Sequence, residues 1–318
     1  MSFSSEVKKE LLNVSFKADH CQRAELAAMM SGAGRIYMEN GCLHAAFITE
    51  QEQAAGRFVK LLSQAAGITA GIVQAHHLQQ KNKISYVIDL AEEEDVKKLF
   101  LLTGILGEDG CIRSDSMYFD GLLQKNCCIR AFLRGAFLAA GSISNPKKSY
   151  HFEIVCSERR KAEQLQELLH VFDLDAKIVS RKNHEIVYLK EGAQIVDALN
   201  IMGAHTALMD LENVRIIKEM RNDINRRVNC ETANINKTVS AAYRQKEAIR
   251  FLQQQGKLKE LSVQLQEMAA LRMEHPEIPI KELGALCSPP VGKSGVNHRL
   301  RKLEEVAKQL GYEKRNDQ

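Results

Sequence analysis

The chain of 318 residues contains no tryptophan, only five prolines and few aromatic residues, which make up 6% of its composition. It also lacks any run near the roughly 18 consecutive apolar residues that a membrane-spanning helix needs. The first residues show no basic segment followed by an apolar core, so no secretory signal is expected. Hydrophobic residues nevertheless make up 45%, which excludes a disordered or collagen-like chain. We therefore expect a soluble, cytoplasmic protein of two or three packed domains.

The eight cysteines are scattered along the chain and form no pair of the CxxC type. They occupy positions 21, 42, 111, 127, 128, 156, 230 and 287. Zinc sites usually draw their ligands from short sequence spacings, and no such spacing is present. We therefore expect no metal and no cofactor. The adjacent Cys127 and Cys128 are interpreted as small buried thiols of a helix rather than as a redox pair.

Positive charge is concentrated in the last third of the chain, although the formal net charge is only +4. Residues 211–318 hold 20 lysines and arginines against 14 aspartates and glutamates, whereas the remainder holds 24 against 26. Within this third, residues 291–302 carry four basic residues and no acidic one. A cluster of this kind is often only a solvated surface, so its assignment to nucleic-acid binding depends on the motif around it.

A repeat with an offset of 107 residues occupies the first two hundred residues. Residues 26–34 align with residues 133–141, and each segment is followed by a similar strand, at 44–48 and 151–155. The elements expected next are helices at about 50–66 and 158–172, pairs of strands joined by polar turns at 79–82 and 182–184, and closing helices at about 92–104 and 191–201. Each copy therefore predicts the order helix, strand, strand, helix, strand, strand, helix.

Antiparallel strands joined by short turns, with helices on one face, predict an α+β fold in which the two copies pack as a pseudo-dimer. Small side chains recur at helical spacing in both aligned segments. They are Ala27, Ala28, Gly32 and Ala33 in the first copy, and Gly135, Ala136, Ala139 and Ala140 in the second. Because small residues let two helix backbones approach closely, we expect these helices to form the interface between the copies.

Residues 206–258 are interpreted as a helical connector. Helices at 206–225 and 233–255 are expected to flank a turn at 226–232, which carries Arg226 and Arg227 beside several Asn and Thr side chains. Two interpretations of this turn stay open: its arginines contact phosphates, or it is an ordinary capped turn between two helices.

Four of the five prolines fall within residues 276–290. Proline is excluded from helix interiors, so this region divides into short helices. We expect helices at 261–274, 280–286 and 293–310, with a turn at 287–292 between the last two. Two helices joined by a tight turn and preceded by a third predict an all-α helix-turn-helix domain.

The last of these helices has one apolar and one polar face. Its apolar stripe consists of Val296, Leu300, Leu303, Ala307 and Leu310. Polar and basic residues off the stripe and in the preceding turn are the predicted DNA contacts: Ser288, Lys293, Ser294, Asn297, His298, Arg299, Arg301 and Lys302. Asn and Arg read adenine and guanine bidentately, and a recognition helix uses its first turns for such contacts. A generic surface helix would balance these cations with nearby acids, which here appear only at Glu304 and Glu305.

The aligned segments 26–34 and 133–141 resemble degenerate copies of the LAGLIDADG motif of homing endonucleases, whose fold has the same order of helices and strands. In that family an acidic residue at the eighth motif position holds the catalytic metal. The matching positions here are Ala33 and Ala140, and the sixth positions are Ser31 and Leu138. Divalent cations need oxygen ligands, so the resemblance implies a nuclease scaffold without nuclease chemistry, and no enzyme.

The whole chain resembles the WhiA family of bacterial regulators, most specifically over residues 279–284 and 289–303. That family joins an inactive LAGLIDADG-type domain to a helix-turn-helix similar to region 4 of sigma factors. The resemblance implies a sequence-specific, nucleoid-associated transcription regulator linked to cell division, chromosome segregation or sporulation. Its implied partners are double-stranded DNA and other transcription or cell-division proteins, and the internal pseudo-dimer is compatible with a monomer. The alternative is a chromosome-associated structural or protein-docking factor with largely non-specific DNA binding.

The expected domains follow from these elements. They are an N-terminal helix at 1–19, repeats at 20–107 and 108–205, the connector at 206–258 and the helix-turn-helix domain at 259–318.

Overall fold

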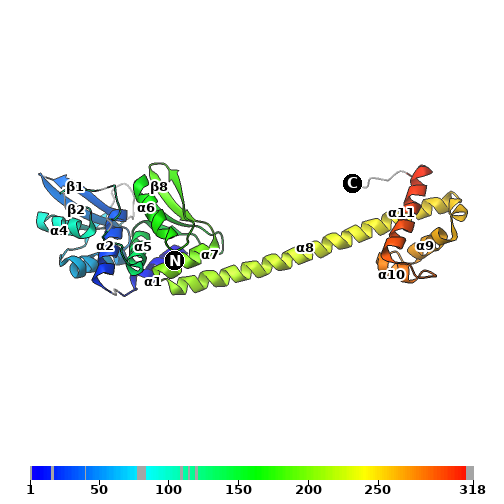
Figure 1. Cartoon of the computed structure of the whole chain (residues 1–318), viewed down its shortest axis with the longest axis horizontal. Coiled ribbons are helices and arrows are strands. Elements are labelled where there is room, and N and C mark those ends of the chain that lie inside the picture. Colours follow the sequence, from blue (N-terminus) through cyan, green and yellow to red (C-terminus); the bar gives the residue numbers. More distant parts are fainter. Residues whose placement is uncertain are drawn as a thin grey trace. The chain divides into compact units, whose positions relative to one another are not determined.

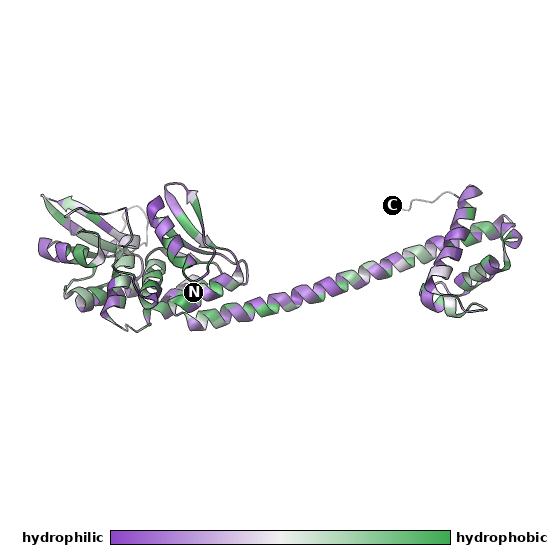
Figure 2. Cartoon of the chain, viewed as in Figure 1, coloured by the Kyte–Doolittle hydropathy of each residue, from purple (hydrophilic) through white to green (hydrophobic). Residues whose placement is uncertain are grey.

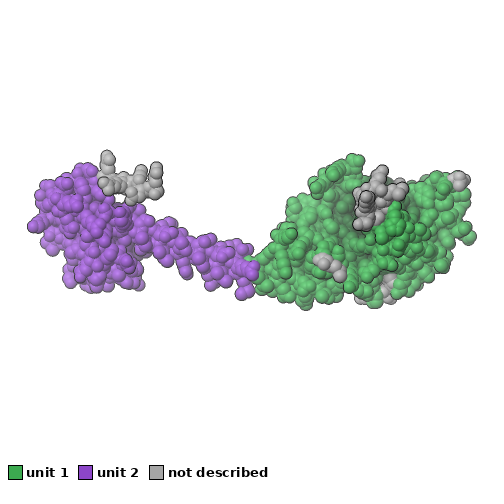
Figure 3. Space-filling view, turned by 180° about the vertical axis from the view of Figure 1, so that it is seen from behind, with its two compact units in different colours: residues 1–218 green, residues 219–318 purple. Residues whose placement is uncertain are grey.

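The computed structural model describes residues 2–15, 18–39, 41–76, 84–107, 110–113, 115–118 and 121–312. The chain divides into two compact units, residues 1–218 and residues 219–318 (Figure 3). None of the helices that the structure describes combines the length and apolar character needed to cross a membrane. Purple and green residues alternate along most helices and strands, as expected for elements with one face toward a core (Figure 2).

The first repeat begins after the N-terminal helix α1 (Phe3–Leu12). Its helices and strands are α2 (Asp19–Ala33), β1 (Gly34–Glu39), β2 (Cys42–Thr49), α3 (Glu52–Leu61) with a π-helical end η1 (Leu62–Ala66), β3 (Val73–His76), β4 (Ile84–Leu90) and α4 (Glu93–Thr103). The strands form one antiparallel sheet in the order β1-β2-β4-β3 (Figure 1). The turn expected at 79–82 lies outside the described residues.

The second repeat has the same order of elements. They are α5 (Asn126–Ala140), β5 (Gly141–Ile143), β6 (Phe152–Cys156), α6 (Arg159–His170), β7 (Lys177–Arg181), β8 (His184–Leu189) and α7 (Gly192–Met202). Its sheet has the equivalent order β5-β6-β8-β7. The predicted α+β fold, with seven elements in the same order in each repeat, is confirmed.

Helices α2 and α5 form the interface between the repeats (Figure 1). A Cβ atom added at Gly135 would lie 2.5 Å from the backbone oxygen of Glu25, and one at Gly32 would lie 2.9 Å from Cβ of Ala139. One side of α2, including Ala24 and Ala28, packs into the core of the second repeat, whereas Leu26 and Met29 on another side pack into the core of the first. The predicted close packing of the two small-residue helices is therefore confirmed.

Helix α8 (His205–Gln254) is continuous over 50 residues, so the expected turn at 226–232 was wrong. Arg226 and Arg227 lie in the middle of this helix, and all residues from 219 to 240 are exposed. The turn was predicted from Asn and Thr residues, which only weakly disfavour a helix. Residues 226–232 contain no glycine or proline, and without such a residue the helix continues through them.

The second unit packs short helices against the C-terminal part of α8. Gly256, with a φ of 68°, follows the end of α8 and leads into a 3₁₀ turn η2 (Lys257–Glu260). Three helices complete the unit: α9 (Val263–Glu274), α10 (Ile280–Ala285) and α11 (Lys293–Gln309). Their order and the turn between α10 and α11 confirm the predicted helix-turn-helix. Four stripe residues, Val296, Leu300, Leu303 and Ala307, are buried in its core. Leu310 is 43% exposed, because it lies at the end of α11 rather than on its inner face.

Candidate nucleic-acid interface

The turn between α10 and α11 is held by close packing of the backbone. Gly284 near the end of α10 is buried, and a Cβ atom there would lie 2.1 Å from the backbone oxygen of Val291 and 2.9 Å from Cγ2 of Val296. The backbone N–H of Val291 donates a hydrogen bond to the backbone oxygen of Gly284, at 2.9 Å. These contacts fix the start of α11 against α10, which a recognition helix requires for a defined orientation on DNA.

Seven of the eight predicted DNA contacts are exposed on or just before α11. They are Ser288, Lys293, Ser294, Asn297, His298, Arg301 and Lys302. The buried stripe of α11 faces the core of the unit, so the polar residues of its first turns occupy the outer face. The structure therefore brings these residues together on one surface, which we call the α11 outer face.

Arg299 is placed differently from the other seven residues. Its side chain is half-buried, and its Nη1 lies 3.5 Å from Oε2 of Glu267 on α9. Oε1 of Glu267 also accepts a hydrogen bond of 2.7 Å from the backbone N–H of Ser288. Arg299 and Glu267 therefore connect α9 with α11 and with the turn before it. Glu267 is absent from the sequence-predicted residues, because the pairing spans 32 positions and leaves no periodic pattern.

The α11 outer face carries little compensating negative charge. Among the described contacts of its cations, Lys302 lies 3.8 Å from the Glu305 carboxylate, an exposed pair that contributes little free energy. The N-cap residue of α11 is Gly292, whose lack of a side chain leaves the first backbone N–H groups directed outward. Such a helix start favours phosphate, because its N–H groups and its dipole are both positive toward the ligand.

Arg272 supports this unit from within. Its residue is only 2% exposed, and its Nη1 donates to the backbone oxygen of Ile278 at 3.1 Å. Burial lowers the pKa of this guanidinium, since the charged form loses hydration. The interaction holds the segment between α9 and α10, and sequence inspection gave no sign that this arginine would be buried.

The positions that match the catalytic motif residues of a homing endonuclease lie at the C-terminal ends of α2 and α5. Ala33 and Ala140 are half-buried there, and a Cβ atom at Gly32 would lie 3.6 Å from Cβ of Ala140. Leu138 is buried, and the hydroxyl oxygen of Ser31 is buried without a hydrogen-bond partner among the described residues. None of these four side chains offers the carboxylate oxygens that a divalent cation would require in this scaffold.

A separate group of metal-ligating side chains lies at the opposite, N-terminal ends of the same helices. His20 and Cys21 of α2 and Cys127 and Cys128 of α5 gather there. The expectation of no metal site considered spacing along the sequence only. It is corrected in its premise, because the packing of the two repeats joins ligands that are more than 100 positions apart.

Comparisons with known proteins agree along the whole chain. Family models match in three consecutive segments: the WhiA N-terminal LAGLIDADG-like domain at residues 19–106, the WhiA LAGLIDADG-like domain at 129–221 and the WhiA C-terminal HTH domain at 224–307. The probable cell division protein WhiA of Lachnoclostridium phytofermentans is 45% identical over 313 residues, which cover 96% of this chain and 98% of the relative. Its counterpart from Clostridium perfringens is 45% identical and covers 98% of each chain.

A solved structure supports the same fold. The crystal structure of full-length WhiA from Thermatoga maritima superposes with a TM-score of 0.58, at 23% identity, over 98% of this chain and 100% of that one. This likeness concerns the fold alone.

Proposed function

The chain belongs to the WhiA family, and from this premise we propose that it is a sequence-specific DNA-binding transcription regulator. Relatives carry the name probable cell division protein, and we assign this chain to the same process, with links to chromosome segregation or sporulation. In this proposal it acts in the cytoplasm on the nucleoid, and its partners are double-stranded DNA and other transcription or cell-division proteins.

The observation that carries the proposal is the pair Asn297 and Arg301 on the α11 outer face. Both side chains are exposed, and they lie one helical turn apart in the first half of α11. Asn and Arg are the side chains that recognise adenine and guanine by paired hydrogen bonds in the major groove. Both occupy the part of a recognition helix that reaches base edges.

Phosphate contacts are assigned to the residues around this pair. Lys293 and Ser294 lie in the first turn of α11, Ser288 lies in the preceding turn, and His298 and Lys302 flank the base-reading pair. Contacts of this kind set the register of the protein on the duplex without reading its sequence. Arg226 and Arg227, now on the exposed middle of α8, are retained as candidate phosphate contacts.

We assign no nuclease activity to the repeats. Alanines 33 and 140 replace the acidic metal ligands of the homing-endonuclease motif, and a methyl group cannot coordinate Mg²⁺ or Mn²⁺. Purified protein incubated with plasmid DNA and either ion should leave the DNA intact. Cleavage that a chelator abolishes, and that a mock purification lacks, would overturn this assignment.

The test of the main proposal is selection of bound duplexes from a randomised pool, followed by affinity measurements across a salt series. The selected duplex should bind at least about a thousandfold more tightly than a scrambled one, as is typical of specific DNA-binding proteins. Equal affinities for both duplexes at every salt concentration would instead support the structural-factor alternative.

One observation favours that alternative, a protein-docking role for the repeats. The outer face of the first sheet has a hollow of about 710 Å³ lined largely by apolar side chains, among them Ile48, Val73 and Val87. Its polar rim includes Asp89, which accepts a hydrogen bond of 2.7 Å from the hydroxyl of Tyr37. This interaction raises the pKa of Tyr37 to about 12, because it favours the protonated phenol. An apolar face with a carboxylate suits a protein surface better than a phosphate backbone.

A further inference from the structure

Four metal-ligating side chains meet where the N-terminal ends of α2 and α5 lie together. His20 and Cys21 belong to the first turn of α2, and Cys127 and Cys128 to the first turn of α5. The ligand atoms, one imidazole nitrogen and three sulfurs, all lie within 4.8 Å of one another. The DNA-binding proposal uses none of these residues.

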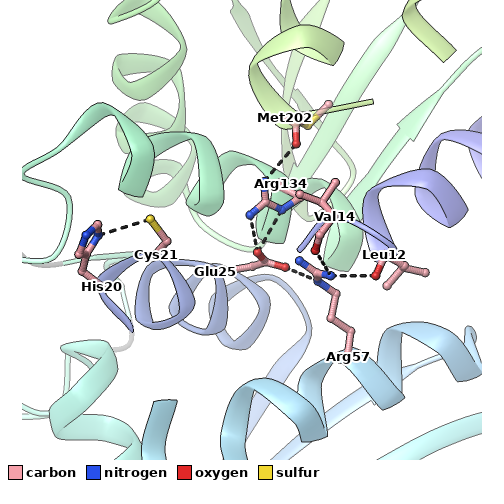
Figure 4. A network of polar contacts seen from close by, with 8 residues as sticks. All are labelled: Leu12, Val14, His20, Cys21, Glu25, Arg57, Arg134 and Met202. Carbon is pink, nitrogen blue, oxygen red and sulfur yellow. Dashed lines mark hydrogen bonds and ion pairs between the residues drawn. The ribbon is translucent and has the colours of Figure 1, made fainter. Parts of the chain in front are cut away.

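The separations between these donor atoms match those around one tetrahedral ion. Nδ1 of His20 lies 3.1 Å from Sγ of Cys128 and 3.4 Å from Sγ of Cys21, and Figure 4 shows the second contact. Zinc bonds of about 2.0 Å to nitrogen and 2.3 Å to sulfur at tetrahedral angles place the donors about 3.5–3.8 Å apart. Shifts of a few tenths of an ångström at the two close pairs therefore suffice to accommodate the ion there.

The repeat explains how the four donors come together. His20 and Cys127 are related by the offset of 107 residues, and so are Cys21 and Cys128. Two equivalent dipeptides thus occupy equivalent positions on two helices that pack side by side. The close approach of α2 and α5 at Gly135 holds the helix backbones together independently of any ion.

Local electrostatics and accessibility also suit metal binding. Neither N-cap residue, Ala18 for α2 or Lys125 for α5, makes a side-chain capping bond in the described part of the chain. The positive ends of both helices are therefore available to stabilise thiolates, which are the form of cysteine that binds metal. Cys128 is buried, whereas Cys127 is exposed and leaves a route for an ion to enter.

We propose that His20, Cys21, Cys127 and Cys128 bind one Zn²⁺ ion that links the two repeats. Three cysteines and one histidine are an established donor set for closed structural zinc sites. A disulfide would use two of the sulfurs and would give the imidazole no role, whereas zinc uses all four donors. The ion ties α2 to α5 at the ends remote from β1 and β5, and so it stabilises the pseudo-dimer.

The experiment is metal analysis of the full-length protein, purified without a histidine tag and under reducing conditions. We expect one zinc per chain by mass spectrometry. Replacement of zinc by Co²⁺ should produce the thiolate charge-transfer band and the intense visible bands of tetrahedral cobalt. Removal of zinc by a strong chelator should lower the melting temperature, and added Zn²⁺ should restore it.

Variants assign the site to its residues. His20→Ala and Cys127→Ser alter half-buried and exposed side chains, so the apoprotein should keep its circular dichroism spectrum while stoichiometric zinc is lost. The matched control is Cys230→Ser, an exposed cysteine on α8, which should retain the ion. Wild-type protein without zinc that gives no tetrahedral cobalt spectrum would overturn the proposal. So would a disulfide among Cys21, Cys127 and Cys128 in protein whose free thiols were trapped at lysis.

Discussion

Two pairs of closely packed helices, α2 with α5 and α10 with α11, use the same structural device for different ends. In each pair one buried glycine permits the approach: Gly135 faces the backbone oxygen of Glu25, and Gly284 faces the backbone oxygen of Val291. The α2/α5 pair is enclosed by the cores of both repeats. The α10/α11 pair buries one face of α11 and exposes the other.

The charges of the two pairs point in opposite directions. Glu25 on α2 is fully buried and pairs with Arg57 of α3 and with Arg134 of α5, whose Nη2 lies 2.7 Å from Oε2 of Glu25 (Figure 4). Arg134 also donates to the backbone oxygen of Met202, and Arg57 to that of Leu12. On α11, Lys293 and Arg301 are exposed. Close helix packing therefore does not indicate function by itself; the direction of the charged side chains does.

The largest expected effect tests the inward-facing charges. Glu25→Gln keeps the shape of the side chain but leaves two buried guanidinium groups without their anion, and should cost about 3–5 kcal/mol of unfolding free energy. Glu163→Gln is the matched control, because Glu163 forms an exposed pair with Arg159 and should cost only about 0–1 kcal/mol. Urea unfolding of the two variants measures both values. A cost for Glu25→Gln no larger than that of the control would show that the buried network is dispensable.

The second prediction tests the approach of α2 and α5. Gly135→Leu and Ala136→Leu should each destabilise the repeats, since overpacking typically costs roughly 1–3 kcal/mol. Gly135 should be the more sensitive position, because its Cβ atom would already collide with the backbone of α2. Gly56→Leu on α3 is the control, since a Cβ atom there meets no described atom within 4 Å. The expected loss is one of amide-exchange protection in α2 and α5. Unchanged protection in both variants would contradict the helix-to-helix interpretation.

The third prediction makes the matching change in the other pair. Gly284→Ala should displace α11 from α10, with a cost of roughly 1–3 kcal/mol confined to the second unit. Binding of DNA should weaken as the start of α11 loses its orientation, while amide protection in α2 and α5 stays unchanged. Normal DNA affinity combined with normal protection in α11 would show that the turn tolerates a Cβ atom.

The two pairs also show how far sequence could predict the molecule. The offset of 107 residues gave the order of elements in both repeats, and the prolines together with Val296 and Leu300 gave the helix-turn-helix. Contacts between remote residues leave no such period, which is why the Glu25 network and the pairing of Glu267 with Arg299 were not foreseen. The gathering of Cys21 with Cys128 escaped for the same reason, and α8 because polar residues alone do not end a helix.

The fourth prediction concerns base recognition by the α11 outer face. Arg301→Ala should weaken binding to the selected duplex by about 1–3 kcal/mol and relax its preference at one or two base pairs. The variant should stay folded, because Arg301 is exposed and lies off the buried stripe. Lys308→Ala, an exposed change in the last turn of α11, is the control and should leave the preference intact. Fluorescence anisotropy with single-base variants of the duplex provides the measurement. Equal losses on selected and scrambled duplexes would make Arg301 an electrostatic contact instead.

The smallest expected effect separates phosphate attraction from base recognition on the same helix. Lys293 lies at the start of α11, where a cation meets a phosphate rather than a base edge. Lys293→Ala should therefore weaken binding to all duplexes alike and reduce the slope of log affinity against log salt by about one unit, since one fewer counterion is released. Single-base variants of the duplex should keep their ranking, in contrast to Arg301→Ala. A changed ranking with an unchanged salt slope would place Lys293 at a base edge, and the division of α11 into a phosphate-binding start and a base-reading middle would then be wrong.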